Sequence, residues 1–548
     1  MNKIVLAQIN TIAGDIKSNT QKIIECISRA KNDGVNLIIF PEYALVGFPY
    51  GDICERHKSI IKIQNEALEK IALETENITV VIGYLKKDKN LISAVSILQN
   101  GKIKKEASNF FELNGEKFGI IVSEDNLENN YLSFVDNVST VIHCVCSPSR
   151  TGKEYKRNEQ MSSFAKKYGI NYIYVNKAGY GDNLSFDGAS RVYDKKGAIS
   201  ARAGVFEEDF LVVENYRGKI NSLPIGMEKE IKTDNFACDY SSDLERTYKS
   251  IVFSIREYFS KNGFSKAVLG LSGGLDSSVA SVLLADALGS QNVWGISMPS
   301  KITSKESKND AKELAKNLGI NFFEIPLPDA IDSMKSMLDF AFEKVATDRY
   351  EQSTTIENVQ ARIRATILWS VSNEHKGMLP IATSDKSEAY IGYATVNGDM
   401  SGGFAPIIDV TKTKLFALAD YMNKNRIPKN VIPQSVLEKP PGAELKINPK
   451  TGKTVCAEED NMPYEFLDEI IWFVENYGYG FDDLLNHSFY YERKHCIPKE
   501  QKEEWISKFY WKSRCAVYKW HIIPPSVITD IHSINSVEYH HPILSKIY

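Results

Sequence analysis

The stretch Ser272-Gly-Gly-Leu-Asp-Ser-Ser278 lies between the apolar run Lys266–Leu271 and a helical pattern over Val279–Leu288. A strand, a glycine-rich turn and a helix in this order form a site for phosphate groups. The glycines let backbone N–H groups approach a polyanion, and the N-terminus of the following helix carries partial positive charge. The hydroxyls of the three serines are further donors. The stretch therefore predicts a pyrophosphate-binding loop in a parallel α/β domain.

This loop differs from the Walker type because it contains no GKS or GKT, so no lysine is placed on a transferring γ-phosphate. Asp276 offers a carboxylate to the Mg²⁺ that accompanies nucleotide phosphates. The loop resembles that of the ATP pyrophosphatases, which cleave ATP between the α and β phosphates to adenylate a substrate. The resemblance implies that ATP contacts Ser272, Gly273, Gly274, Leu275, Asp276, Ser277 and Ser278. The alternative is a Ser/Gly turn that opens an ordinary α/β helix.

The composition is that of a large globular protein. With 548 residues the chain is too long for one ordinary core, so two or more domains are expected. The net charge is −4 with interspersed signs, and no apolar stretch is long enough to span a bilayer. We expect no nucleic-acid or membrane partner and a soluble, cytoplasmic protein. The eight cysteines form no CxxC pair, which is typical of reduced thiols and implies no metal site built from cysteines.

Two α/β patterns divide the chain. The first alternates helical stretches with short apolar strands such as Lys3–Ile9, Asn36–Phe40 and Phe118–Val122. A polar, aperiodic segment with Pro224 follows, and a second α/β pattern contains the phosphate loop. The predicted domains are therefore residues 1–214, a linker 215–243, and residues 244–548.

Further motifs follow the phosphate loop in the second half. They are Glu357–Arg364 (ENVQARIR), Thr383–Tyr393 (TSDKSEAYIGY), Gly398–Gly403 (GDMSGG), Asp409–Thr413 (DVTKT) and Pro440–Lys446 (PPGAELK). In this order the motifs resemble those of the NAD synthetase family, in its long form with an N-terminal nitrilase-like glutaminase domain. The resemblance implies an ATP-pyrophosphatase fold related to the adenine nucleotide alpha hydrolases, and adenylation of deamido-NAD by Mg·ATP before ammonia attacks.

The resemblance also assigns site residues. It implies that Asp276 and Glu388 bind Mg²⁺, and that Met298, Thr383 and Lys412 contact ATP. For deamido-NAD the implied contacts are Asn358, Arg362, Lys386, Glu388 and Lys519, while Asp399 polarises ammonia or binds a ribose hydroxyl. Lys519 matches a family lysine in Val517–Ser526, where Trp520 and His521 replace two arginines. Asp385 replaces the usual Asn or Gly, a change that the sequence does not explain. The family also implies a homo-oligomer, a dimer or larger.

The first half resembles the nitrilase family. Phe40–Phe48 contains Glu42 where the family has a catalytic glutamate, and Tyr174–Gly179, Phe186–Ser190 and Phe206–Asp209 are similar too. The resemblance implies an αββα sandwich over residues 1–213.

The nucleophile differs, because Ser123 stands where that family has cysteine, and a serine hydroxyl is hardly ionised without a base. The sequence string that contains the catalytic lysine of the family is also missing from Gly101–Phe118. Lys104 or Lys105 is the alternative for that lysine, and Cys144 or Cys146 is the alternative for the nucleophile. Two defects in one triad favour a degenerate glutaminase and a synthetase that uses ammonia.

Three other hypotheses remain open at this point. In the first, the chain is an ATP pyrophosphatase for another carboxylate or carbonyl substrate, although such enzymes lack these strings. In the second, it hydrolyses glutamine, and Ser123 is an engineered change from cysteine. Finally, it is a non-catalytic nucleotide-binding scaffold, against which the intact loop and Glu388 argue.

Overall fold

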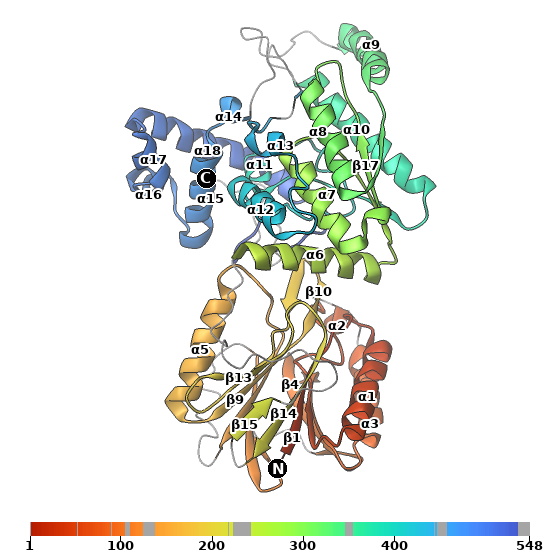
Figure 1. Cartoon of the computed structure of the whole chain (residues 1–548), viewed down its shortest axis with the longest axis vertical. Helices are drawn as coiled ribbons and strands as arrows, with labels where there is room; N and C mark the ends of the chain where they lie inside the picture. The colour runs from red at the N-terminus through yellow and green to blue at the C-terminus, as the bar shows by residue number, and fades with distance from the viewer. Residues whose placement is uncertain are drawn as a thin grey trace. The chain divides into compact units, whose positions relative to one another are not determined.

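The computed structural model describes residues 2–51, 53–57, 59–88, 90–104, 110–123, 138–216, 219–222, 243–345, 354–442, 444–445 and 457–534. The chain divides into two compact units, Met1–Ser241 and Ser242–Tyr548 (Figure 1).

The first unit contains two facing β-sheets. One sheet has the strand order β15-β14-β1-β2-β3-β4-β5, and the other has the order β13-β12-β9-β8-β7-β6. The first consists of β1 (Asn2–Gln8), β2 (Leu37–Ile39), β3 (Thr79–Lys87), β4 (Leu91–Gln99), β5 (Lys102–Lys104), β14 (Asp209–Tyr216) and β15 (Lys219–Ser222). The second consists of β6 (Phe110–Leu113), β7 (Glu116–Val122), β8 (Thr140–Val145), β9 (Asn171–Asn176), β12 (Arg191–Tyr193) and β13 (Ile199–Arg202). A separate hairpin joins β10 (Ala178–Gly181) to β11 (Leu184–Asp187).

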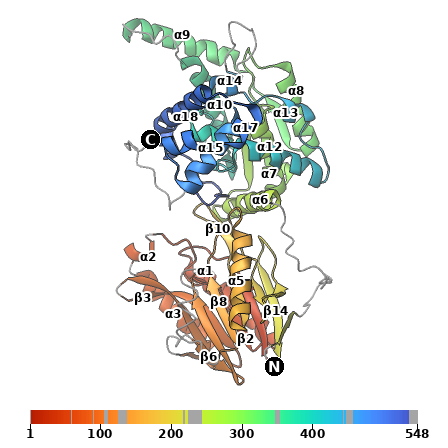
Figure 2. The ribbon, with the colours of Figure 1, turned by 90° about the vertical axis from the view of Figure 1, so that its left-hand side faces the viewer.

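Helices cover the outer faces of this sandwich. Helices α1 (Ile16–Asn32) and α3 (Ser59–Leu73) pack on the seven-stranded sheet, and α5 (Lys153–Tyr168) packs on the six-stranded sheet (Figures 1 and 2). Alternate residues of β1 serve two cores: Val5 packs toward the helices, whereas Ile4 and Leu6 face the second sheet. Burial on both faces explains why these strands are continuous apolar runs in the sequence.

Strand structure continues past residue 214, where the N-terminal domain was predicted to end. Strand β14 reaches Tyr216 and pairs with β15, so the first part of the predicted linker completes the sheet. Residues 223–242 of that linker lie outside the described residues.

The second unit is built on a parallel sheet of order β18-β17-β16-β19. Its strands are β16 (Lys266–Gly270), β17 (Val293–Ser297), β18 (Asn321–Glu324) and β19 (Met378–Pro380). Helix α6 (Asp243–Lys261) precedes the first of these strands, and the connecting segments include α7 (Leu275–Leu288), α8 (Lys305–Leu318), α9 (Pro328–Val345) and α10 (Thr355–Glu374). As predicted, a strand delivers the chain to the glycine-rich loop, and α7 begins within that loop.

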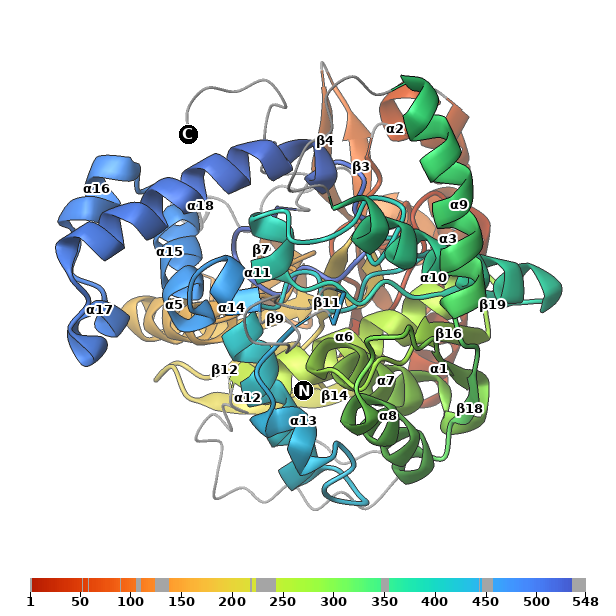
Figure 3. The same cartoon turned by 90° about the horizontal axis from the view of Figure 1, so that it is seen from above.

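Helices complete the second unit. They are α11 (Lys386–Tyr390), α12 (Lys412–Asn425), α13 (Gln434–Glu438), α14 (Ala457–Asp460), α15 (Tyr464–Tyr477), α16 (Phe481–Asn486), α17 (Tyr490–His495) and α18 (Lys499–Trp520). Figure 3 shows α15 to α18 gathered on one side of the unit, beside the region of the parallel sheet. Among the described residues, no helix combines the length and apolar character needed to cross a membrane.

Candidate active site

A cavity of about 1590 Å³ opens at the carboxyl ends of β16, β17 and β19. Parallel sheets bind ligands at this edge because the loops that follow the strands converge there. The motifs that are scattered through the sequence meet in its wall: among its lining residues are Gly273, Met298, Arg362, Thr383, Glu388 and Asp399.

The phosphate loop forms one wall of this cavity. Gly273 has φ +80°, and a Cβ at this position would lie 2.1 Å from the Ser307 carbonyl oxygen, so only glycine fits. Residues Ser272–Asp276 line the cavity at the start of α7. The hydroxyls of Ser277 and Ser278 instead donate to the Gly274 carbonyl oxygen at 3.2 and 2.7 Å, and both residues are buried. These two hydroxyls shape the loop, and neither Ser277 nor Ser278 is among the residues that line the cavity.

Next to the loop, one lysine holds three carboxylates together. The ammonium of Lys412, at the start of α12, lies 2.7 Å from Asp276, 2.5 Å from Asp385 and 2.9 Å from Glu388. The side chain of Lys412 is fully buried, whereas Asp276 and Glu388 are partly exposed to the cavity. Tyr464 completes the group: its hydroxyl donates to Glu388 at 3.5 Å.

Burial and charge act against each other in this cluster. Burial raises the pKa of the Asp385 carboxyl to about 7, although the neighbouring Lys412 ammonium lowers it. Burial likewise holds the pKa of Glu388 well above its usual range. For Lys412, burial acts to lower the pKa, but the three carboxylates outweigh it and the pKa is raised. The site is therefore built around a charged lysine and an excess of acidic groups.

The same cluster fits a hard divalent cation. Among the described residues, oxygens of Asp276, Asp385 and Glu388 lie within 4.8 Å of one another. Carboxylate oxygens are the ligands that Mg²⁺ prefers, and it binds through one or two of them together with substrate phosphates. The two predicted metal ligands thus meet, and Asp385 joins them.

The structure gives a role to Asp385, the residue that replaces the usual Asn or Gly of the family. Its carboxylate accepts from the Glu388 N–H at 2.9 Å and thereby caps α11, while its second oxygen contacts Lys412. The spacing of three residues between Asp385 and Glu388 places both in one turn, which was the available sequence signal.

Three further residues that were predicted to bind the dinucleotide, Asn358, Arg362 and Lys519, line the cavity. Asn358 and Arg362 lie on α10 and line the cavity, where Arg362 Nε donates to the Val396 carbonyl oxygen at 3.2 Å. Asp399 accepts from the Thr395 N–H at 2.7 Å, and burial raises its pKa. Lys519 also lines the cavity and donates to the carbonyl oxygens of Gly392 and Ala394, both at 2.7 Å.

Lys386, which was predicted to bind the dinucleotide, is not among the residues that line the cavity. Its side chain is fully buried and its ammonium contacts Glu475 at 2.6 Å, Asp409 at 3.3 Å and Asp530 at 3.6 Å. Burial acts to lower the pKa of Lys386, but the three carboxylates raise it overall. Neighbouring positions on a helix point in different directions, so Lys386 faces the protein interior although Glu388 faces the cavity.

Arg364, the last residue of the ENVQARIR motif, is a cavity residue to which the sequence analysis assigned no role. It lines the cavity and its Nε donates to the Met298 carbonyl oxygen at 3.2 Å. Burial lowers the pKa of its guanidinium to about 10. Its helical spacing from Asn358 and Ala361 on α10 carried the signal, since these positions fall near one face of the helix.

In the first unit, Glu42 and Ser123 follow the carboxyl ends of strands in the two facing sheets. Glu42 is 5% exposed and its carboxylate accepts from the Cys146 N–H at 3.0 Å. Ser123 follows β7 with φ +70°, its N–H donates to the Cys144 carbonyl oxygen at 3.3 Å, and its own carbonyl oxygen accepts from His143 Nε2 at 2.8 Å. The backbone at Ser123 thus keeps a left-handed turn at the end of a strand.

The residues that could replace the missing lysine and cysteine of the glutaminase site lie in different environments. Lys104 is exposed on the edge strand β5, and Lys105 lies outside the described residues. Cys144 is fully buried between the sheets, and burial raises the pKa of its thiol. Cys146 is half-buried, with its sulfur 2.9 Å from the Glu42 carbonyl oxygen.

Comparison with protein families matches both halves of the chain. Residues 247–498 match the family model described as NAD synthase, and residues 3–120 match the model described as carbon-nitrogen hydrolase. The second match includes Glu42 and ends before Ser123.

Similar proteins cover nearly the whole chain. A protein of Thermotoga maritima named glutamine-dependent NAD(+) synthetase is 34% identical over 540 residues, covering 89% of this chain and 91% of that protein. A protein of Aquifex aeolicus with the same name is 34% identical over 525 residues, covering 86% and 88%.

Two solved structures agree with this. The ADP complex of glutamine-dependent NAD+ synthetase from Acinetobacter baumannii has a TM-score of 0.71 and 28% identity, covering 99% of this chain and 98% of that one. The structure of the Cytophaga hutchinsonii enzyme gives a TM-score of 0.81 at 20% identity, covering 100% and 98%, and supports the fold. The predicted fold class, a nitrilase-like sandwich followed by a parallel-sheet synthetase domain, is confirmed.

Proposed function

This chain belongs to the family of the glutamine-dependent NAD(+) synthetases, and we propose that it amidates deamido-NAD to NAD with free ammonia as its nitrogen donor. One observation carries the synthetase part: the phosphate loop, Asp276 and Glu388 line one large cavity, and the buried Lys412 contacts both carboxylates. Its volume of about 1590 Å³ exceeds the roughly 300–1,000 Å³ that is usual for one ligand, as two nucleotides require.

The reaction joins two anions, so the site must offset negative charge. The nicotinate carboxylate attacks the α-phosphorus of ATP and pyrophosphate leaves; ammonia then attacks the acyl carbon and AMP leaves. The backbone N–H groups of the loop stabilise the phosphates, and the buried ammonium of Lys412 offsets the charge of the carboxylates that line the cavity. Asp276 and Glu388, with Asp385, would hold Mg²⁺, which neutralises phosphate charge when bound.

The other cavity residues orient the substrates. Met298 and Thr383 line the ATP side, and Asn358, Arg362 and Lys519 line the side assigned to the dinucleotide. Asp399 lines the same cavity, where its carboxylate polarises the incoming ammonia or binds a ribose hydroxyl. A homo-oligomeric assembly stays a prediction.

The proposed nitrogen source follows from the first unit. An amide carbonyl needs an ionised or base-activated nucleophile, and the Ser123 position supplies only a hydroxyl. Lys104 is exposed on an edge strand, and Cys144 is sealed in the core with a raised thiol pKa. These positions support a sandwich that has kept its fold and Glu42 but lost glutamine hydrolysis.

The first test supplies deamido-NAD and Mg·ATP with either ammonium chloride or glutamine freed of ammonia, and measures NAD by an enzymatic cycling assay. We expect product with ammonium and at most about 1% of that rate with glutamine, since a missing nucleophile costs several orders of magnitude. Equal rates would refute the proposed loss of glutaminase activity. No product with either donor would favour a nucleotide-binding scaffold.

A second prediction concerns the hydroxyl of Ser123. Ser123→Ala is expected to leave the ammonium-dependent kcat within about twofold of wild type, because a half-buried side chain outside the synthetase cavity is a mild substitution. A variant that loses glutamine-dependent product while keeping ammonium-dependent product would show that Ser123 acts as a nucleophile. Ser123→Cys serves as the matched variant that restores the thiol at the same backbone position.

A further inference from the structure

Asp468, in the first part of α15, contacts the two helices that carry Glu388 and Lys412. Its Oδ1 accepts from the Ser387 hydroxyl of α11 at 2.5 Å. Its Oδ2 accepts from the Thr413 N–H of α12 at 2.8 Å and from the Thr413 hydroxyl at 2.6 Å. Asp468 is buried and lies outside the residues that line the cavity.

These contacts replace a missing helix cap. The residue before α12 is Thr411, whose side chain makes no capping hydrogen bond. The first two N–H groups of α12 are satisfied from outside: Lys412 N–H donates to the Ser387 hydroxyl oxygen at 2.8 Å, and Thr413 N–H donates to Asp468. An anionic acceptor at a helix N-terminus is favourable because of the helix dipole.

The chain of contacts ends at the catalytic groups. Ser387 precedes Glu388, and Thr413 follows Lys412, so each partner of Asp468 is the direct neighbour of a side chain in the carboxylate–lysine cluster. A shift of either helix start would change the 2.9 Å distance between Lys412 and Glu388. A misplacement of about 1 Å at such a site lowers rates by orders of magnitude.

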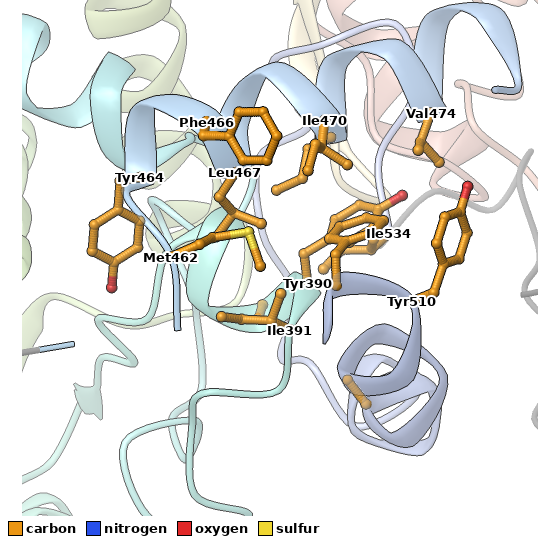
Figure 4. Close-up of a cluster of buried hydrophobic side chains, with 14 of the residues drawn as sticks. Tyr390, Ile391, Met462, Tyr464, Phe466, Leu467, Ile470, Val474, Tyr510 and Ile534 are labelled. Carbon is orange, nitrogen blue, oxygen red and sulfur yellow. The ribbon is translucent and has the colours of Figure 1, made fainter. Parts of the chain in front are cut away.

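Helix α15 is itself held rigidly. Its apolar face, which includes Phe466, Leu467 and Ile470, is part of a buried cluster (Figure 4). The cluster also contains Tyr390, Ile391 and residues of α18. Tyr464, one helical turn before Asp468, also reaches Glu388. The carboxylate of Asp468 therefore projects from a well-packed helix toward the first turns of α11 and α12.

We propose that Asp468 is a positioning residue of the synthetase site, which sets the starts of α11 and α12 and so holds Glu388 and Lys412 against the phosphate loop. This inference rests on the proposed function for its role in turnover. Its contribution to binding the phosphates of ATP is independent of turnover.

The test compares binding of Mg·ATP and of AMP by isothermal titration calorimetry in the full chain, alongside kcat with ammonium. Asp468→Ala is expected to weaken ATP binding and lower kcat by about 10- to 100-fold each, as for residues that support metal ligands. AMP binding should change by less than about threefold, because AMP lacks the β and γ phosphates. Asp468→Asn keeps one acceptor oxygen, and its effects should be intermediate.

The matched control is Asp483→Asn, which alters a carboxylate that accepts from the Gly480 N–H at the start of α16. It is expected to change neither ligand's affinity nor kcat. Ser387→Ala tests the same route without removing a charge, should Asp468→Ala fail to fold.

Unchanged ATP affinity and kcat in Asp468→Ala and Ser387→Ala would overturn the inference. An equal loss of ATP and AMP affinity would overturn it too, because the effect would then not depend on the β and γ phosphates. If wild type binds ATP but makes no NAD, the proposed function fails, and the ratio of ATP to AMP affinity in the variants still decides the role of Asp468.

Discussion

Replacing Lys412 with methionine is expected to lower kcat for NAD formation by about 10²–10³-fold, the scale of removing one fixed electrostatic group from a reaction site. Methionine keeps most of the side-chain volume but removes the ammonium that contacts Asp276, Asp385 and Glu388. The carboxylates then repel one another and the substrate phosphates. The measurement is steady-state release of pyrophosphate with saturating ammonium.

Lys424→Met on the same helix is the matched control for Lys412→Met. Lys424 pairs with Asp420 at 2.6 Å, but both side chains are more than half exposed, and exposed pairs contribute little. Its kcat should stay within about twofold of wild type. If Lys412→Met keeps a kcat within threefold of wild type, Lys412 is a structural lysine and the assignment is wrong.

The second large effect concerns stability. Lys386→Met is expected to lower the free energy of unfolding of the second unit by about 3–5 kcal/mol, since it leaves buried carboxylates without their cation. Glu475 and Asp409 lose their contacts at 2.6 and 3.3 Å. The KM for deamido-NAD should stay unchanged in the folded fraction, as Lys386 does not line the cavity. Urea unfolding followed by circular dichroism gives the first quantity, and initial rates give the second.

A double variant sharpens this test. Adding Glu475→Gln to Lys386→Met removes one of the uncompensated charges and should recover part of the lost stability, because contacting residues are not additive. A wild-type stability together with a raised KM for deamido-NAD would contradict the buried role and restore Lys386 as a substrate ligand.

The sequence predicted the elements that carry strong local signals. The run Lys266–Leu271, the glycines at 273 and 274 and the helical pattern after them predicted β16, the loop and α7, because each residue type has one dominant conformational reason to be there. The meeting of Asp276 with Glu388 was predicted only by resemblance. Their 112-residue separation gives no local signal, and only the parallel order of strands brings them together.

The direction of individual side chains was the feature of the site that was hardest to predict from the sequence. Lys386 and Glu388 are two residues apart in one short helix, yet one faces the interior and the other the cavity. Ser277 and Ser278 were expected to donate to phosphate, but a helix N-terminus also offers carbonyl oxygens, and Gly274 takes both hydroxyls. Asp468 carries no motif, so its role depends entirely on the packing of α15.

Helix α15 also determines how far the synthetase half is modular. Asp468 and Glu475 lie two turns apart on α15, and they bind the adjacent residues Ser387 and Lys386 of α11. These two attachments fix both the rotation and the axial position of one helix relative to the other. A chimera that exchanges the C-terminal helices with those of a relative must therefore transfer both carboxylates in the same register, or the new segment will fold without aligning the reaction centre.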